Sequence, residues 1–187
     1  MLGVHGLAYH FSHDPAITEF MPHVAATSDR AEPYVWAIDS DHAPAYWFPR
    51  DCPRVTFWPL RPPDASAAAL LGGAGRVHAV EWAWLHRIRE AQLYRYEFDA
   101  APFRRWPPAA GYLVAEQAVR PLAVHPVGDL LAAHADAGIE IRLVPTLWPL
   151  ADLVQRSGLE FSMIRMRNAT RGSGVPPSTT ITPVDHR

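Results

Sequence analysis

The chain has 187 residues, a length typical of one domain, and its 49% apolar and 19% charged residues predict a folded core. Its formal charge of −2 argues against a nucleic-acid or polybasic membrane partner, because neither phosphate attraction nor counterion release has an excess of positive charge to act on. All 17 basic residues are arginine, which excludes Schiff-base lysines and phosphate-loop lysines, and a single cysteine excludes intramolecular disulfides and four-cysteine zinc sites.

Strands and short helices are expected to follow one another along the chain. The expected strands cover residues 7–11, 34–38, 54–58, 77–81, 93–98, 111–115, 119–124 and 139–144. The expected helices cover residues 14–20, 39–48, 65–71, 84–90, 126–137 and 147–156, and the apolar segment 161–166 fits either type. Strands dominate the middle and helices the end, so the pattern predicts an α+β fold with mixed, mostly antiparallel sheets and short flanking helices.

The ends of the chain give two further expectations. Residues 1–169 are expected to form one globular domain, and residues 170–187, rich in Pro, Ser and Thr, a disordered tail. The N-terminus lacks the basic region and apolar run of a signal peptide, and no stretch approaches the roughly 18 apolar residues of a membrane span. We therefore expect a cytoplasmic protein.

The first cluster with chemical potential is the segment that contains His10 and Ser12. On a strand these two side chains share a face, where an imidazole and a hydroxyl can hold a ribose or a carboxamide. The alternative is a histidine hydrogen-bonded inside the sheet. His10, His13 and Asp14 could also be metal ligands, but their spacing suits a strand poorly and no second His/Cys pair supports them, so no metal is expected.

The second cluster runs from Tyr46 to Arg54. Arg50 and Arg54 offer bidentate donors for an anion, and Tyr46 and Trp47 offer aromatic faces for a planar ring. Cys52 is interpreted either as a nucleophile activated by the two arginines or, as is more usual for a free cysteine, as a small buried packing residue.

A third cluster lies near the end of the expected domain, where Glu160 precedes Arg165 and Arg167. An arginine-rich edge with one acid is most often a solvated salt-bridge network, which contributes little to stability.

Four motifs carry a resemblance to known families. They read Tyr-His-Phe-Ser-x-Asp-Pro-x-Ile from residue 9, Val-Trp-Ala-Ile-Asp from residue 35, Trp-Phe-Pro-Arg-Asp-Cys-Pro-Arg-Val from residue 47, and Ile-Arg-Met-Arg-Asn-Ala from residue 164. Together they resemble a bacterial family of unknown function over most of residues 7–169. Their order also resembles, more distantly, the ADP-ribosyltransferase fold of the histidine–tyrosine–glutamate class.

The ADP-ribosyltransferase resemblance implies roles for particular residues. It implies that His10 and Ser12 hold the nicotinamide and ribose of NAD, and that Tyr46 stacks on the nicotinamide. The catalytic glutamate of that class would fall on Gly111, where this chain has no side chain. Glu116 or Glu160 would have to replace it in stabilising the oxocarbenium ion.

These observations predict a small-molecule enzyme that acts on NAD or a related nucleotide by glycosidic-bond chemistry, with NAD as substrate and no required cofactor. His10, Tyr46, Glu116 and Glu160 are the expected catalytic residues. The expected binding residues are Ser12, Trp47, Arg50 and Arg54. Two alternatives stay open: a cleft that serves another small-molecule reaction, with His10 and Asp51 or Glu116 as acid and base, and a non-catalytic module that binds a ligand or a protein.

A definite geometry follows from the first hypothesis. The strands that contain His10 and Val35–Ile38 should share a sheet, and a short helix should bring Tyr46 beside His10 and Ser12 in one cleft with Arg50 and Arg54 at its mouth.

Overall fold

The computed structural model of the chain describes residues 6–24, 32–107 and 111–171. The described chain divides into two compact units. The first unit comprises the residues up to Arg50 together with Ala91–Gly128, and the second comprises Asp51–Glu90 together with the residues from Asp129 onward. The predicted domain of residues 1–169 thus contains two compact units, and its status as one domain stays a prediction. Residues 172–187 of the predicted tail lie outside the described part.

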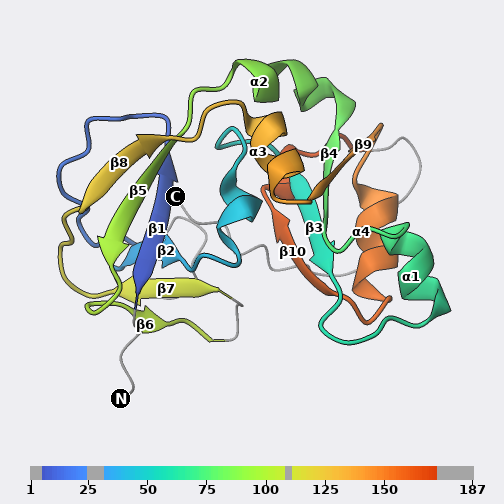
Figure 1. Ribbon diagram of the computed structural model, residues 1–187, viewed down its shortest axis with the longest axis horizontal. Helices are drawn as coiled ribbons and strands as arrows, with labels where there is room; N and C mark the ends of the chain where they lie inside the picture. Colours follow the sequence, from blue (N-terminus) through green and yellow to red (C-terminus); the bar gives the residue numbers. More distant parts are fainter. Residues whose placement is uncertain (1–5, 25–31, 108–110, 172–187) are drawn as a thin grey trace. The chain divides into compact units, whose positions relative to one another are not determined.

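The first unit is built on a six-stranded sheet with the strand order β6-β7-β2-β1-β5-β8 (Figure 1), in which every neighbouring pair is antiparallel. Its strands are β1 (Leu7–Ser12), β2 (Val35–Ile38), β5 (Tyr94–Asp99), β6 (Arg104–Arg105), β7 (Tyr112–Ala115) and β8 (Ala123–Pro126). The 3-10 helix η1 (Ala43–Tyr46) follows β2. The prediction that β1 and β2 share a sheet is confirmed.

The two faces of this sheet carry different side chains because successive residues of a strand point to opposite sides. One face packs Ala8 against Tyr96 and Phe98. The opposite face is largely aromatic, with Tyr9 and Phe11 of β1 beside the rings of the neighbouring strands. Each face of the sheet therefore has its own apolar cluster.

The second unit contains a four-stranded sheet with the order β10-β3-β4-β9, in which only the β4–β9 pair is parallel. Its strands are β3 (Arg54–Trp58), β4 (Val77–Glu81), β9 (Glu140–Val144) and β10 (Glu160–Ile164). Its helices are α1 (Ala65–Leu71), η2 (Trp82–Trp84), α2 (Leu85–Glu90), α3 (Leu130–Asp136), α4 (Trp148–Gln155) and η3 (Met166–Asn168). The predicted α+β class with mostly antiparallel sheets is confirmed.

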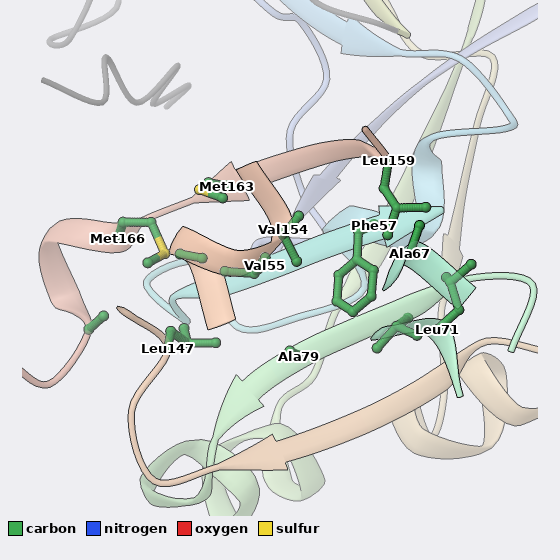
Figure 2. Close-up of a cluster of buried hydrophobic side chains, with 13 residues drawn as sticks. Val55, Phe57, Ala67, Leu71, Ala79, Leu147, Val154, Leu159, Met163 and Met166 are labelled. Carbon is green, nitrogen blue, oxygen red and sulfur yellow. The ribbon is translucent and has the colours of Figure 1, made fainter. Parts of the chain in front are cut away.

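The core of the second unit lies between its sheet and helices α1 and α4 (Figure 2). Val55 and Phe57 of β3 are fully buried, and Leu71 of α1 and Val154 of α4 pack against the same cluster. On the other side of β4, the buried His78 donates from Nδ1 to Nε2 of His134 of α3 over 3.1 Å. Burial lowers the pKa of His78 well below its usual 6.5, so this imidazole is neutral, and its hydrogen bond with His134 joins α3 to the sheet.

Some predicted elements differ from those in the structure, and side-chain capping explains two of the differences. Residues 14–20 do not form the predicted helix, because the Asp14 carboxylate accepts the backbone N–H of Ala16 in a turn. Helix α3 begins after Asp129, whose carboxylate accepts two backbone N–H groups, rather than at Pro126, which belongs to β8. The strand expected over 119–124 is shifted to β8, and the undecided segment 161–166 contributes to β10.

In the described part of the chain, none of the helices is both long and apolar enough to cross a membrane.

Phe57→Ala is expected to lower the free energy of unfolding by about 3–5 kcal/mol, because it leaves a cavity in the core of the second unit. Phe161, which pairs with Phe57 across β3 and β10 but is 42% exposed, gives the matched control. Phe161→Ala should cost less than about 1.5 kcal/mol. Urea denaturation followed by tryptophan fluorescence measures both values, and equal losses would contradict this assignment of the core.

Candidate functional site

His10 lies half-buried on β1, and its ring makes contacts within the protein. Its Nδ1–H donates to the backbone carbonyl of Trp36 over 3.1 Å, and its ring contacts the edge of Phe20 with the centroids 4.9 Å apart. Burial lowers the pKa of His10 to about 4, although the bond to Trp36 opposes the shift. The ring is therefore neutral near pH 7. These contacts match the alternative of a histidine hydrogen-bonded inside the sheet.

The prediction that Tyr46 shares a cleft with His10 and Ser12 is wrong. His10 lies opposite Tyr96 in the β1–β5 register and belongs to the face of that residue. Tyr46 stacks on Phe11, the next residue of β1, with the ring centroids 6.5 Å apart and the planes 8° apart. Neighbouring residues of a strand face opposite sides, so Tyr46 and His10 lie on opposite faces of the sheet. The hydroxyl of Ser12 accepts the backbone N–H of Asp14.

The short helix predicted after β2 is confirmed, and it places Tyr46 on the aromatic face. The Tyr46 hydroxyl donates to the hydroxyl of Tyr112 over 2.6 Å. Trp47 ends η1, and Arg50 is exposed at the end of the first unit, where its backbone N–H donates to Nε2 of His13. Tyr46 is therefore partly buried against the aromatic cluster of this face.

Glu116 does not lie where the resemblance would need a glutamate. It follows the last residue of β7, whereas Gly111 precedes the first, so the two positions lie at opposite ends of the strand, about 16 Å apart at the usual rise. The Glu116 side chain is 72% exposed and pairs with Arg104 over 3.3 Å. Its role is that of a surface ion pair.

The other predicted residues belong to the second unit, and two of them are buried. Arg54 is 2% exposed and donates to the Cys52 carbonyl over 2.8 Å, so the prediction of an exposed anion donor at a cleft mouth is wrong. Cys52 is fully buried, and burial raises its pKa to about 12 despite the opposing charge of Arg54. It is a packing residue, as the more usual of the two interpretations has it. Glu160 opens β10 opposite Trp58.

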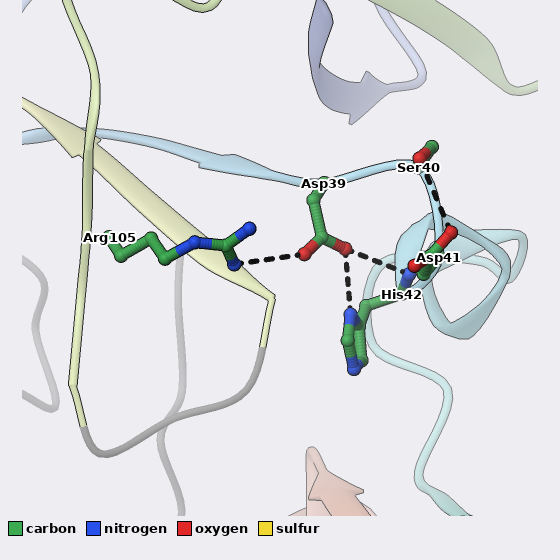
Figure 3. A network of polar contacts seen from close by, with 5 residues as sticks. All are labelled: Asp39, Ser40, Asp41, His42 and Arg105. Atoms are coloured by element: carbon green, nitrogen blue, oxygen red, sulfur yellow. Dashed lines mark hydrogen bonds and ion pairs between the residues drawn. The ribbon is translucent and has the colours of Figure 1, made fainter. Parts of the chain in front are cut away.

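The first unit contains a polar network that the sequence did not reveal (Figure 3). Asp39, directly after β2, accepts on Oδ1 both the Nδ1–H of His42 over 2.7 Å and its backbone N–H over 3.0 Å. Its other oxygen, Oδ2, faces NH1 of Arg105 at 3.5 Å. The carboxylate thereby fixes the orientation of the imidazole and keeps its proton on Nδ1, which leaves Nε2 as the basic nitrogen of the ring.

The His42 ring occupies the space that a side chain on residue 111 would need. A Cβ built on Gly111 would overlap Cγ and Nδ1 of His42, and the φ of +80° at Gly111 also favours glycine. The backbone N–H of Asp39 donates to the Gly111 carbonyl over 2.9 Å. The space beside Gly111 is thus filled by an imidazole that a carboxylate orients.

Asp39 is ionised at neutral pH. Partial burial opposes its ionisation, but the hydrogen bonds from the ring and the backbone N–H of His42 and the guanidinium of Arg105 together hold the pKa of Asp39 below its ordinary 3.8. A carboxylate, an imidazole and an exposed guanidinium therefore lie together where β2 ends and β7 begins. An Asp-x-x-His spacing directly after a buried strand is the signal in the sequence that points to them.

Comparison with known families gives one match. Residues 9–169 match the model of a family of unknown function, DUF6886. No curated protein and no solved structure matches the chain. In the described residues, no group of three or more His, Cys, Asp or Glu side chains is arranged to hold a metal ion.

Gly111→Ala is expected to destabilise the protein by about 2 kcal/mol or more, because the new methyl group overlaps His42 and the backbone is held at positive φ. Gly128 is the control, since its φ is +83° and nothing lies within 4 Å of its built Cβ. Gly128→Ala should cost only the backbone term, about 1 kcal/mol. Adding His42→Ala to Gly111→Ala should recover part of the loss in thermal denaturation, and equal costs at both glycines would refute the packing.

His10→Gln is expected to flatten the dependence of stability on pH between about 6.5 and 4. The folded state disfavours charged His10, so the stabilisation is complete above pH 6.5 and is lost as the pH falls toward 4. The wild-type loss from this residue should reach about 3 kcal/mol. Urea denaturation at several pH values measures it. The exposed His125 gives the control His125→Gln, and an unchanged slope in His10→Gln would contradict the buried, neutral assignment.

Proposed function

The chain belongs to the DUF6886 family of unknown function, and we propose that it is a small-molecule enzyme in which His42, oriented by Asp39, acts as a general base. The observation that carries this proposal is the double hydrogen bond from His42 to Oδ1 of Asp39. A carboxylate that holds an imidazole by Nδ1 fixes its tautomer and stabilises the imidazolium that forms when Nε2 takes a proton. NAD or a related nucleotide is the proposed substrate, and no required cofactor is proposed.

The proposed reaction is hydrolysis of the N-glycosidic bond of a nicotinamide nucleotide. His42 takes a proton from water at Nε2 as the water oxygen bonds to C1′ of the ribose. The C1′–N bond breaks, and its electron pair returns to the pyridinium ring, which leaves as neutral nicotinamide. Because this leaving group requires no proton donor, a single base is sufficient for the step.

Two features support glycosidic-bond chemistry over other reactions of the same base. The imidazole of His42 fills the place of the residue-111 side chain, which is where the resemblance puts the catalytic glutamate. The ionised carboxylate of Asp39 directly behind it supplies negative charge close to a developing oxocarbenium ion. Tyr46 retains its proposed role as the aromatic face for nicotinamide. His10 and Ser12 have no role in this proposal.

The test is the release of nicotinamide from NAD, nicotinamide mononucleotide and nicotinamide riboside, separated by chromatography. His42→Gln should lower the rate about 100-fold or more, which is the usual contribution of a general base. Asp39→Asn should also lower it, because an amide holds the ring without its charge.

His125→Gln serves as the control, because this histidine is 52% exposed on the far edge strand β8 of the same sheet. It should leave the rate unchanged. Failure of the wild-type protein to cleave any of the three substrates would reject the proposed reaction, and a His42→Gln variant with the wild-type rate would reject His42 as the base.

A further inference from the structure

Asp39 is held very differently on its two oxygens. Oδ1 receives two short bonds from His42, whereas Oδ2 faces Arg105 at 3.5 Å, longer than an ordinary hydrogen bond. The Asp39 side chain is 18% exposed and that of Arg105 is 69% exposed. One half of the network is therefore fixed and largely buried, and the other half is loose and open to solvent.

An exposed ion pair of this length contributes little energy, so Arg105 can turn toward a second anion at small cost. A guanidinium has five N–H donors in a planar fork, and the contact with Asp39 uses one of them. Arg105 can therefore bind a phosphate or carboxylate in the bidentate manner while it stays beside Asp39.

The backbone fixes Arg105 at this position. Arg105 pairs with Leu113 between β6 and β7, and the N–H of Asp39 donates to the carbonyl of Gly111, which directly precedes β7. The guanidinium and the imidazole therefore reach the same carboxylate from two different segments, β6 and the residues after β2. An anion bound to Arg105 would lie close to the base.

We propose that Arg105 determines the specificity of the Asp39–His42 site by binding an anionic group of the substrate, a phosphate or a carboxylate. This inference rests on the proposed function, since it assigns the class of substrate to the same site. Arg105 takes the place that Arg54 had in the sequence-based prediction, because Arg54 is buried in the second unit.

Nicotinamide mononucleotide and nicotinamide riboside differ only by a phosphate, and this pair of substrates tests the proposal. Arg105→Gln should lower kcat/KM for the mononucleotide at least about 10-fold more than for the riboside, mainly through KM, as expected for the loss of a charged bidentate contact. Arg105→Lys should recover part of the difference. The control is Arg120→Gln, which breaks an exposed ion pair with Glu19 in the same unit and should leave the preference unchanged.

A binding measurement separates failure of this inference from failure of the proposed function. Titration with inorganic phosphate and with acetate, followed by the NMR signals of the arginine side chains, should shift the Arg105 signal in the wild type and in His42→Gln, whether or not nicotinamide is released. A shifted Arg105 signal without any cleavage would uphold the anion site and reject the reaction. An unshifted Arg105 signal, or an equal loss of kcat/KM for both substrates in Arg105→Gln, would overturn the inference.

Discussion

Asp39 joins three segments of the first unit at one point. Its backbone N–H donates to the residue before β7, its Oδ1 accepts from His42 in the turn into η1, and its Oδ2 faces Arg105 of β6. Partial burial would raise the free energy of the ionised carboxylate if these donors were absent. The ionised carboxylate is therefore stable only with these donors around it. Two of the donors belong to His42, so the carboxylate also fixes the position of that ring.

Gly111 completes this arrangement by leaving space. A side chain at residue 111 and the imidazole of His42 cannot both be present, because they would occupy the same volume. Glycine at residue 111 and the position of the His42 ring, which comes from another segment of the chain, therefore depend on each other.

The six-stranded sheet separates Phe11 and Tyr46 from His10. Phe11 and His10 are neighbours in the chain, but the pleat puts the first beside Tyr46 and the second beside Phe20.

The second unit uses its buried polar groups for structure. The His78–His134 pair joins α3 to β4, and the carboxylate of the buried Glu81 accepts the backbone N–H groups of Leu147 and Thr170. These buried groups have partners within the unit, which is consistent with a role in holding its elements together.

Local sequence patterns account for most of the secondary structure and for the α+β class, and they favoured the packing interpretation of Cys52 without deciding it. Strands such as Arg54–Trp58 and Val77–Glu81 follow from local runs of β-branched and aromatic residues, and helix α1 from its Asp64 cap and the glycine that ends it. Local preferences of this kind are properties of a few adjacent residues.

Only the tertiary structure decided which side chains meet. Alternation along β1 shows that His10 and Phe11 point apart, but it does not say which of the two faces η1 will cover; that depends on how the chain turns after Ile38. The contact between His42 and Gly111 joins residues far apart in the chain, and it depends on the pairing of β2 with β7. Such contacts are set by strand pairing and burial over the whole unit, and no segment of the sequence contains them.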